Sequence, residues 1–134
     1  PIHNSITQQD VLRAKAQHPS AKLAMHPECP PEALQHADMI GATSAIIDYA
    51  LQNEQEDILF GTECGVYNDL IQKYPRRHFY QLRGDKLICP DMKMTSLQDV
   101  YMAITGAGGE EIVLEEPLRK AAKRSLDNML KYGG

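Results

Sequence analysis

Residues 57–82 read DILFGTECGVYNDLIQKYPRRHFYQL, and the predicted fold follows from the pattern of these residues. The apolar run over 57–62 is typical of a buried strand, whereas the apolar residues from Val66 to Tyr74 recur at helical spacing. Pro75 ends this helix, and residues 78–82 form a second candidate strand. A strand, a helix and a strand in so short a stretch predict parallel pairing with a helical crossover.

The same alternation continues on both sides of this unit. We expect a helix over 7–17, which the capping-box variant Thr7-Gln8-Gln9-Asp10 begins, and a strand over 21–25. A short helix that begins at Pro30-Pro31 and has weak apolar support as far as Met39 should follow, and then a longer helix that begins at 41–44. Beyond Gly84 the pattern changes to an irregular loop, a helix capped by the box Thr95-Ser96-Leu97-Gln98, an extended stretch over 112–114 and a last amphipathic helix from Glu116. The fold class predicted is therefore α/β, with helices on both faces of a small parallel sheet, which is a three-layer α/β/α sandwich.

Composition excludes several classes of protein. The chain has 134 residues, of which 43% are hydrophobic and 24% charged, so it is not globally disordered. No apolar run approaches the roughly 18 to 20 residues that span a bilayer, and a net charge of −4 argues against nucleic-acid binding. The opening residues 1–5 resemble no signal peptide, and three cysteines are too few for a disulfide framework, so we expect a cytoplasmic protein.

Three loops follow the predicted strands, and ligands bind at that edge of parallel sheets. These loops contain 26–29, 63–65 and Cys89. His26 and Glu28 lie two residues apart, so in an extended segment both face the same side and can share acid–base work. Alternatively, His26 hydrogen-bonds its own loop and Glu28 caps the next helix.

Two further motifs suggest binding sites. Gly41-Ala42-Thr43-Ser44 begins a helix, where free backbone N–H groups and the helix dipole favour an anion, although Thr43 or Ser44 could simply cap that helix. Cys89 precedes a proline, a pairing that is common at iron–sulfur ligands. The other two cysteines, Cys29 and Cys64, are more typical of small buried residues.

Together these motifs resemble one family. The ordered set is His26-Pro27-Glu28-Cys29-Pro30-Pro31-Glu32, Gly41-Ala42-Thr43-Ser44, Gly61-Thr62-Glu63 and Cys89-Pro90-Asp91-Met92-Lys93-Met94-Thr95, and over essentially its whole length the chain resembles the C-terminal part of quinolinate synthase. The resemblance implies an enzyme that condenses iminoaspartate with dihydroxyacetone phosphate to quinolinate, a precursor of NAD. It also implies three similar α/β/α domains around a [4Fe–4S] cluster, which is held by one cysteine from each domain and acts as a Lewis acid.

The resemblance also implies roles for individual residues. His26 and Glu28 match the substrate-contacting histidine and the acid–base glutamate, and both are expected to contact substrate. Thr43 matches a residue that binds the anionic groups of the substrate, and Cys89 matches the third domain's cluster ligand. Ala42 lies in the same substrate-binding stretch, where the family usually has serine, so one hydroxyl contact is expected to be lost.

The resemblance further implies a division of the chain. Residues 1–95 match the third α/β domain, and residues 96–134 match a helical segment expected to pack on the first domain. Pro1-Ile2-His3 resembles the end of a Cys-x-x-His motif, so the first two domains and their two cluster ligands are expected to be missing and the cluster to be poorly held by this chain alone. Self-association through exposed apolar faces is then expected. The alternatives are a stand-alone domain that binds small anions and a structural domain without activity.

Overall fold

The computed structural model describes residues 1–54 and 56–133. These residues contain a central four-stranded, fully parallel sheet with the strand order β2-β1-β3-β4. Its strands are β1 (Lys22–Met25), β2 (Met39–Ile40), β3 (Ile58–Gly61) and β4 (Phe79–Gln81). The predicted α/β class with a small parallel sheet is therefore confirmed.

Both faces of the sheet are buried, because successive side chains of a strand point to opposite faces. Leu23, Met25 and Leu59 pack on one face, and Ile58 and Phe60 pack on the other. All five side chains are fully buried. Strands buried on both sides appear in sequence as continuous apolar runs, which is why the three longer strands could be predicted.

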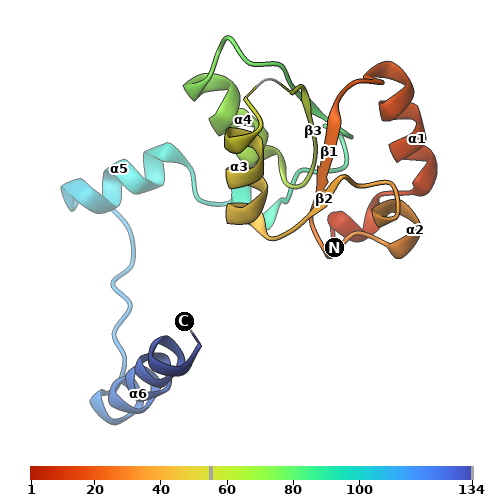
Figure 1. The fold of residues 1–134 in the computed structure, drawn as a ribbon. Helices are drawn as coiled ribbons and strands as arrows, with labels where there is room; N and C mark the ends of the chain where they lie inside the picture. The colour runs from red at the N-terminus through yellow and green to blue at the C-terminus, as the bar shows by residue number, and fades with distance from the viewer. Residues whose placement is uncertain (55, 134) are drawn as a thin grey trace. The chain divides into compact units, whose positions relative to one another are not determined.

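Helices cover the two faces and complete three layers (Figure 1). The helices α1 (Gln8–Gln17) and α2 (Pro31–Leu34) contribute to the core that contains Leu23. The helices α3 (Thr43–Gln52) and α4 (Cys64–Lys73) contribute to the core that contains Phe60. The α/β/α sandwich expected from the alternating pattern is present.

The edge strand β2 was not predicted, since Met39 was assigned to the helix that begins at Pro31. The structure ends α2 at Leu34, and Met39 instead pairs with Ala24 of β1. The Asp38 carboxylate, which accepts a hydrogen bond from the backbone N–H of Leu23 at 2.8 Å, holds the start of this strand against β1. A strand of two residues carries no periodicity that a sequence pattern could reveal.

Two capping boxes begin helices, one as predicted and one shifted by a residue. At α1, Thr7 and Asp10 form the expected reciprocal pair. At α5 (Leu97–Thr105), the cap is Ser96 with Asp99, and not Thr95 with Gln98. Either hydroxyl could begin a helix, but the Asp99 carboxylate accepts from both the backbone N–H and the hydroxyl of Ser96 at 2.7 and 2.6 Å.

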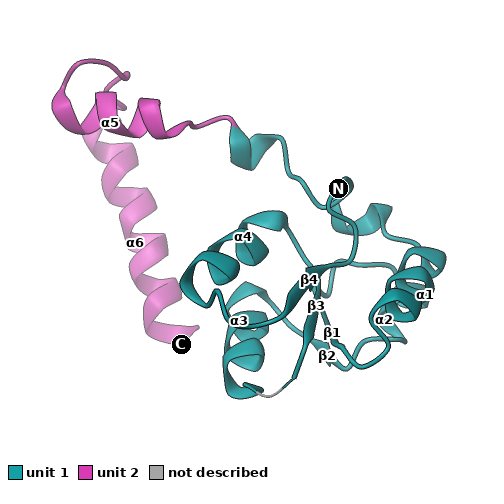
Figure 2. Cartoon of the chain, turned by 90° about the horizontal axis from the view of Figure 1, so that it is seen from above, with its two compact units in different colours: residues 1–93 teal, residues 94–134 magenta. Residues whose placement is uncertain are grey.

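The chain separates into two compact units, Pro1–Lys93 and Met94–Gly134 (Figure 2). The second contains α5 and α6 (Glu116–Tyr132), and Gly134, the last residue of the expected helical segment, lies outside the described residues. The expected extended stretch over 112–114 has no regular structure.

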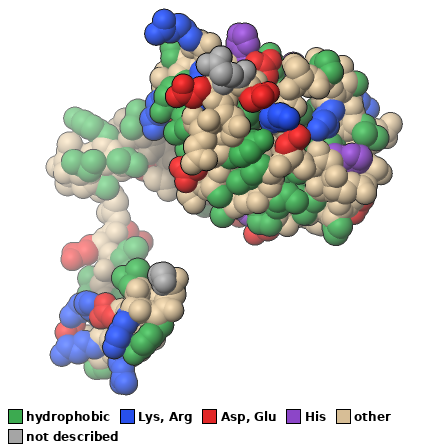
Figure 3. All heavy atoms as spheres, viewed as in Figure 1, with side chains coloured by type: hydrophobic (Ala, Val, Ile, Leu, Met, Phe, Trp, Pro, Cys, Tyr) green, Lys and Arg blue, Asp and Glu red, His purple; other side chains and the backbone are tan. Residues whose placement is uncertain are grey.

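The helices of the second unit do not bury their apolar faces. Within the described residues, neither α5 nor α6 contains a buried side chain. Figure 3 shows hydrophobic and basic side chains together on the surface of α6. Across the parts of the chain that the structure describes, no helix combines the length and the apolar character that crossing a membrane requires.

Candidate active site

The sheet order places the candidate site at a topological switch point. From β1 the chain turns to β2 on one side and then returns to β3 on the other side, so the carboxyl ends of β1 and β3 are neighbours. Such a point is where open α/β sheets bind ligands. A cleft of about 490 Å³ opens there, and its lining includes His3, His26, Glu28, Thr43, Thr62 and Glu63.

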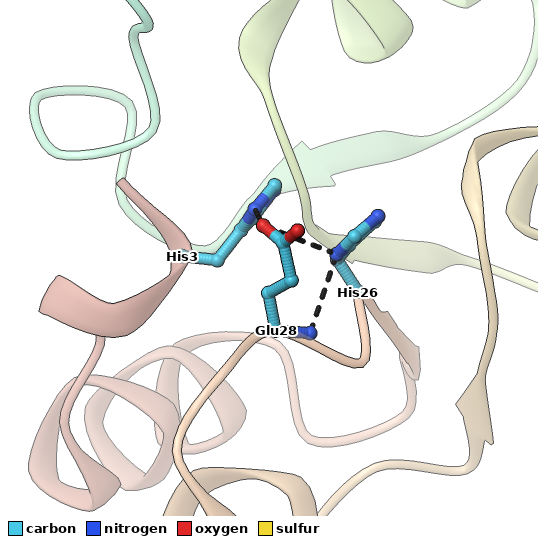
Figure 4. Close-up of side chains that lie close together, drawn as sticks. All are labelled: His3, His26 and Glu28. Carbon is cyan, nitrogen blue, oxygen red and sulfur yellow. Dashed lines mark hydrogen bonds and ion pairs between the residues drawn. The ribbon is translucent and has the colours of Figure 1, made fainter. Parts of the chain in front are cut away.

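Three of these side chains form one cluster (Figure 4). His26 and Glu28 belong to the loop that follows β1, and His3 begins the 3₁₀ helix η1 (His3–Ser5). The His3 and His26 rings stack, with centroids 4.3 Å apart and planes 10° from parallel. Oε2 of Glu28 lies 3.1 Å from Nδ1 of His3 and 3.9 Å from Nδ1 of His26.

Hydrogen bonding assigns the ring protons of this cluster. Nδ1 of His26 accepts the backbone N–H of Glu28 at 3.3 Å, so the proton of the neutral ring is on Nε2. An ionised carboxylate only accepts, so Nδ1 of His3 donates to Glu28. Nε2 of His3 lies 3.5 Å from Oγ1 of the buried Thr62, which adds a polar contact behind this ring.

The contacts among these three residues determine the charges of Glu28 and His26 at neutral pH. The hydrogen bond from His3 lowers the pKa of Glu28, so its carboxylate is ionised. Burial and the neighbouring His3 ring lower the pKa of His26, so this imidazole is neutral. An anionic carboxylate beside a neutral imidazole N–H is a pair that can accept one proton and donate another.

A metal ion does not fit this cluster as it stands. Ligand atoms of His3, His26 and Glu28 all lie within 4.8 Å of one another, which is close enough to consider a shared ion. However, a ring nitrogen binds a metal through a lone pair in the ring plane, and the planes of the two stacked rings are nearly parallel. The two lone pairs therefore do not converge on one point.

The start of α3 offers backbone donors to the cleft. Its N-cap is Ala42, and within the described residues no side chain caps the helix. The alternative of capping by Thr43 or Ser44 is therefore wrong, since both residues lie inside the first turn. Thr43 lines the cleft, so uncapped N–H groups and a hydroxyl group lie at its edge.

The three cysteines have different surroundings. Cys29 and Cys64 are buried, as expected, and burial raises the pKa of Cys29 to about 11. Burial and the hydrogen bond to Glu63 also raise the pKa of Cys64. Cys89 is partly exposed and lies in the loop after β4, so it is the accessible cysteine among the three.

Glu63 connects Cys89 to the cleft. Its carboxylate, at 7% exposure, is paired with Lys93 at 3.0 Å, and its Oε1 accepts the backbone N–H of Cys89 at 3.4 Å. Burial acts to raise the pKa of Glu63, but the hydrogen bonds from Lys93 and the Gly65 backbone outweigh it and lower the pKa. The carboxylate is therefore ionised.

The structure brings His26, Glu28 and Thr43 to one cleft, and it places Ala42 at the start of the helix that borders this cleft. The alternative in which Glu28 caps α2 is wrong, because its carboxylate contacts His3 instead, although His26 does hydrogen-bond its own loop. Sequence reasoning did not assign His3 to the site. Its match to the end of a Cys-x-x-His motif was the available signal.

Comparison with known proteins then decides the family. The family model described as Quinolinate synthetase A protein matches residues 1–131. The chain belongs to the quinolinate synthase family. The resemblance found in the sequence is thereby confirmed, and a stand-alone binding domain is not favoured.

Several curated relatives match the chain over nearly its whole length. A quinolinate synthase of Caldicellulosiruptor bescii is 39% identical over 131 residues, which are 98% of this chain and 43% of the relative. Those of Clostridium kluyveri and Methanosarcina barkeri are 38% and 36% identical, over 96% and 97% of this chain and 42% of each relative. The chain thus spans about two fifths of the length of the quinolinate synthases that it matches.

Proposed function

We propose that this chain is the part of a quinolinate synthase that supplies the acid–base pair of the active site and one cysteine ligand of its cofactor. The reaction is the condensation of iminoaspartate with dihydroxyacetone phosphate to quinolinate, which serves NAD biosynthesis. The observation that carries this proposal is the hydrogen-bonded cluster of His3, His26 and Glu28 in the cleft at the switch point. The family match supplies the reaction, and the side chains of His3, His26 and Glu28 supply groups suited to it.

Each residue has a defined task in this proposal. Glu28 accepts a proton from bound substrate at its carboxylate and returns it later, because it is ionised at neutral pH. Nε2–H of His26 donates a hydrogen bond to a substrate oxygen, since the other ring nitrogen is engaged with the loop. Thr43 and the uncapped N–H groups that follow Ala42 bind an anionic group of the substrate.

The family's [4Fe–4S] cluster fits this chain through one residue. Of the three cysteines, Cys89 is the partly exposed one, whereas Cys29 and Cys64 are buried. Cys89 would therefore hold one iron, and the remaining ligands would come from the rest of the enzyme. When bound, such a cluster supplies a Lewis acid to the substrate.

The rest of the enzyme has further roles in this proposal. Residues 1–95 act as the third α/β domain of the enzyme, and the two preceding domains contribute the other cluster ligands. The helical segment 96–134 packs on the first domain, which would cover the apolar side chains that α5 and α6 leave exposed. Without that partner, these faces favour self-association. We place the enzyme in the cytoplasm, where free thiols such as those of this chain persist.

A chimera tests this function. This chain would replace the part of the Caldicellulosiruptor bescii enzyme that it matches, and quinolinate formation from iminoaspartate and dihydroxyacetone phosphate would be measured after anaerobic cluster assembly. We expect turnover in the chimera, and its loss in Glu28→Gln while the visible spectrum of the cluster is retained. Glu32→Gln is the matched control, since Glu32 is an exposed glutamate on α2.

Two results would contradict the proposal. One is a chimera that holds its cluster but forms no quinolinate. The other is a Glu28→Gln variant that turns over as fast as the unmodified chimera and the Glu32→Gln control.

A further inference from the structure

The segment that carries Cys89 has one end fixed by packing. Leu87 is fully buried, and its carbonyl accepts the backbone N–H of Cys64 at 2.8 Å. Beyond it, Ile88 and Met92 leave 45% and 64% of their surface exposed. Apolar burial therefore fixes the segment at Leu87 but not the residues beyond it.

Polar contacts to one carboxylate hold the remainder of the segment. Oε1 of Glu63 accepts the Cys89 backbone N–H at 3.4 Å and pairs with Nζ of Lys93 at 3.0 Å. The same carboxylate is fixed from the other side, because its Oε2 accepts the Gly65 backbone N–H at 2.6 Å at the start of α4. Glu63 thus connects the end of β3 to both sides of the Cys89-Pro90 turn.

The pairing with Lys93 also balances charge beside Cys89. A buried carboxylate without a partner would disfavour negative charge on a neighbouring thiolate or anionic cluster. The Lys93 ammonium makes the Glu63–Lys93 pair neutral overall. Lys93 itself is 44% exposed, so changing it does not open the core.

We infer that Glu63 and Lys93 are positioning residues that hold Cys89 in place as a cluster ligand. The inference rests on the proposed function for the cluster, but the restraint on Cys89 is a property of this chain alone. Glu63 supplies the acceptor for the Cys89 amide, and Lys93 keeps that carboxylate fixed and its charge compensated.

Amide hydrogen exchange in the 134-residue chain, followed by NMR, tests the restraint. We expect Glu63→Gln to speed exchange of the Cys89 amide about tenfold, because the neutral amide oxygen of glutamine is a weaker acceptor than the carboxylate and no longer forms an ion pair with Lys93. Lys93→Gln should speed it severalfold, and Lys93→Arg should restore the rate of the unmodified chain. The Leu82 amide, which donates to the carbonyl of Phe60 at 2.9 Å, reports on opening of the sheet as a whole.

The control variant is Lys73→Gln, which breaks an exposed pair with Asp69 of 2.9 Å. It should leave the Cys89 amide unchanged. The restraint is contradicted if Glu63→Gln and Lys93→Gln leave the exchange of this amide unchanged, or if they speed it only in proportion to the Leu82 amide.

A second measurement distinguishes the proposed role of Cys89 as a cluster ligand from the proposed positioning role of Glu63 and Lys93. In the chimera described above, Lys93→Gln should shift the reduction potential and the electron paramagnetic resonance spectrum of the cluster, and Lys93→Arg should return both. If Cys89→Ala keeps its full cluster, the ligand role is wrong and the inference fails together with it. If Cys89→Ala loses the cluster but Lys93→Gln leaves the potential and the spectrum unchanged, Cys89 remains a ligand and the positioning role is wrong.

Discussion

The His3 ring stacks on the His26 ring at a centroid distance of 4.3 Å, which brings the third residue of the chain against the loop that follows β1. Each ring has a different task toward Glu28: His3 donates to its carboxylate, and His26 accepts its backbone N–H. The conformation of Glu28 is therefore fixed at both its backbone and its side chain. The pKa of Glu28 should therefore depend on His3.

His3→Ala should raise the pKa of Glu28 toward its ordinary value, because the hydrogen bond from His3 is the main cause of the lowered pKa. A pH titration of the Glu28 carboxyl carbon by NMR measures this change. His36→Ala is the control, since the His36 ring contacts Gln8 and not the cleft. An unchanged Glu28 pKa in His3→Ala would show that the contact does not govern this carboxylate.

Asp10 should account for part of the chain's loss of stability in acid. Its carboxylate, buried at the start of α1, is paired with Arg83 and with Lys86 at 2.8 Å. Burial acts to raise the pKa of Asp10, but the hydrogen bonds from Lys86, Thr7 and Arg83 hold it well below the ordinary value of 3.8. Because the folded state binds the proton less tightly than the unfolded state, this stability is present above the ordinary pKa and is lost as the pH falls below it.

Asp10→Asn should therefore lower the free energy of unfolding by about 2 kcal/mol at neutral pH, as expected for hydrogen bonds to a charged group. The difference from the unmodified chain should shrink as the pH falls below 4, because protonation of Asp10 removes the same charge. Urea unfolding at several pH values measures both effects. Asp69→Asn, which removes one member of the exposed Lys73–Asp69 pair, should lower the free energy of unfolding by less than about 0.5 kcal/mol. A constant difference across the pH range would contradict this account of Asp10.

Local sequence patterns predicted those features of the fold and the site that depend on residues close together in the sequence. His26 and Glu28 were found because they directly follow a strand whose apolar run is evident. His3 was not assigned to the site, because its contact with Glu28 joins residues 25 positions apart and depends on how η1 packs. The cap of α5 was misplaced because Thr95 and Ser96 have the same capping chemistry, and only the position of Asp99 in space selects Ser96.

Gly61→Ala should destabilise the sheet at the point where it supports the site. A Cβ added at Gly61 would lie 2.7 Å from Cγ of the fully buried Met25, which has no room to move away. The expected cost is about 1 to 3 kcal/mol of unfolding free energy. The Gly61 carbonyl also accepts the His26 backbone N–H at 3.1 Å, so the His26 ring signals should shift as well.

Gly84→Ala is the control for this substitution. Its added Cβ would meet only the amide end of Gln81 at 3.3 Å, and a side-chain end can move. We expect a change within about 0.5 kcal/mol. Equal costs at the two glycines, measured by urea unfolding, would contradict a specific clash with Met25.

Ala42→Ser should stabilise the chain, because α3 begins without a side-chain cap in the part of the chain that the structure describes. The backbone of Ala42 is extended, with φ −66° and ψ 170°, which is the conformation in which a serine hydroxyl accepts an N–H of the first turn. The expected gain is about 1 kcal/mol, and for a unit of this size it raises the midpoint of thermal unfolding by roughly 4 to 8 °C. Ser44→Ala is the matched control, since Ser44 lies inside the first turn, and its removal should change the midpoint little. If Ser44→Ala lowers the midpoint as much as Ala42→Ser raises it, then Ser44 and not position 42 governs the start of this helix.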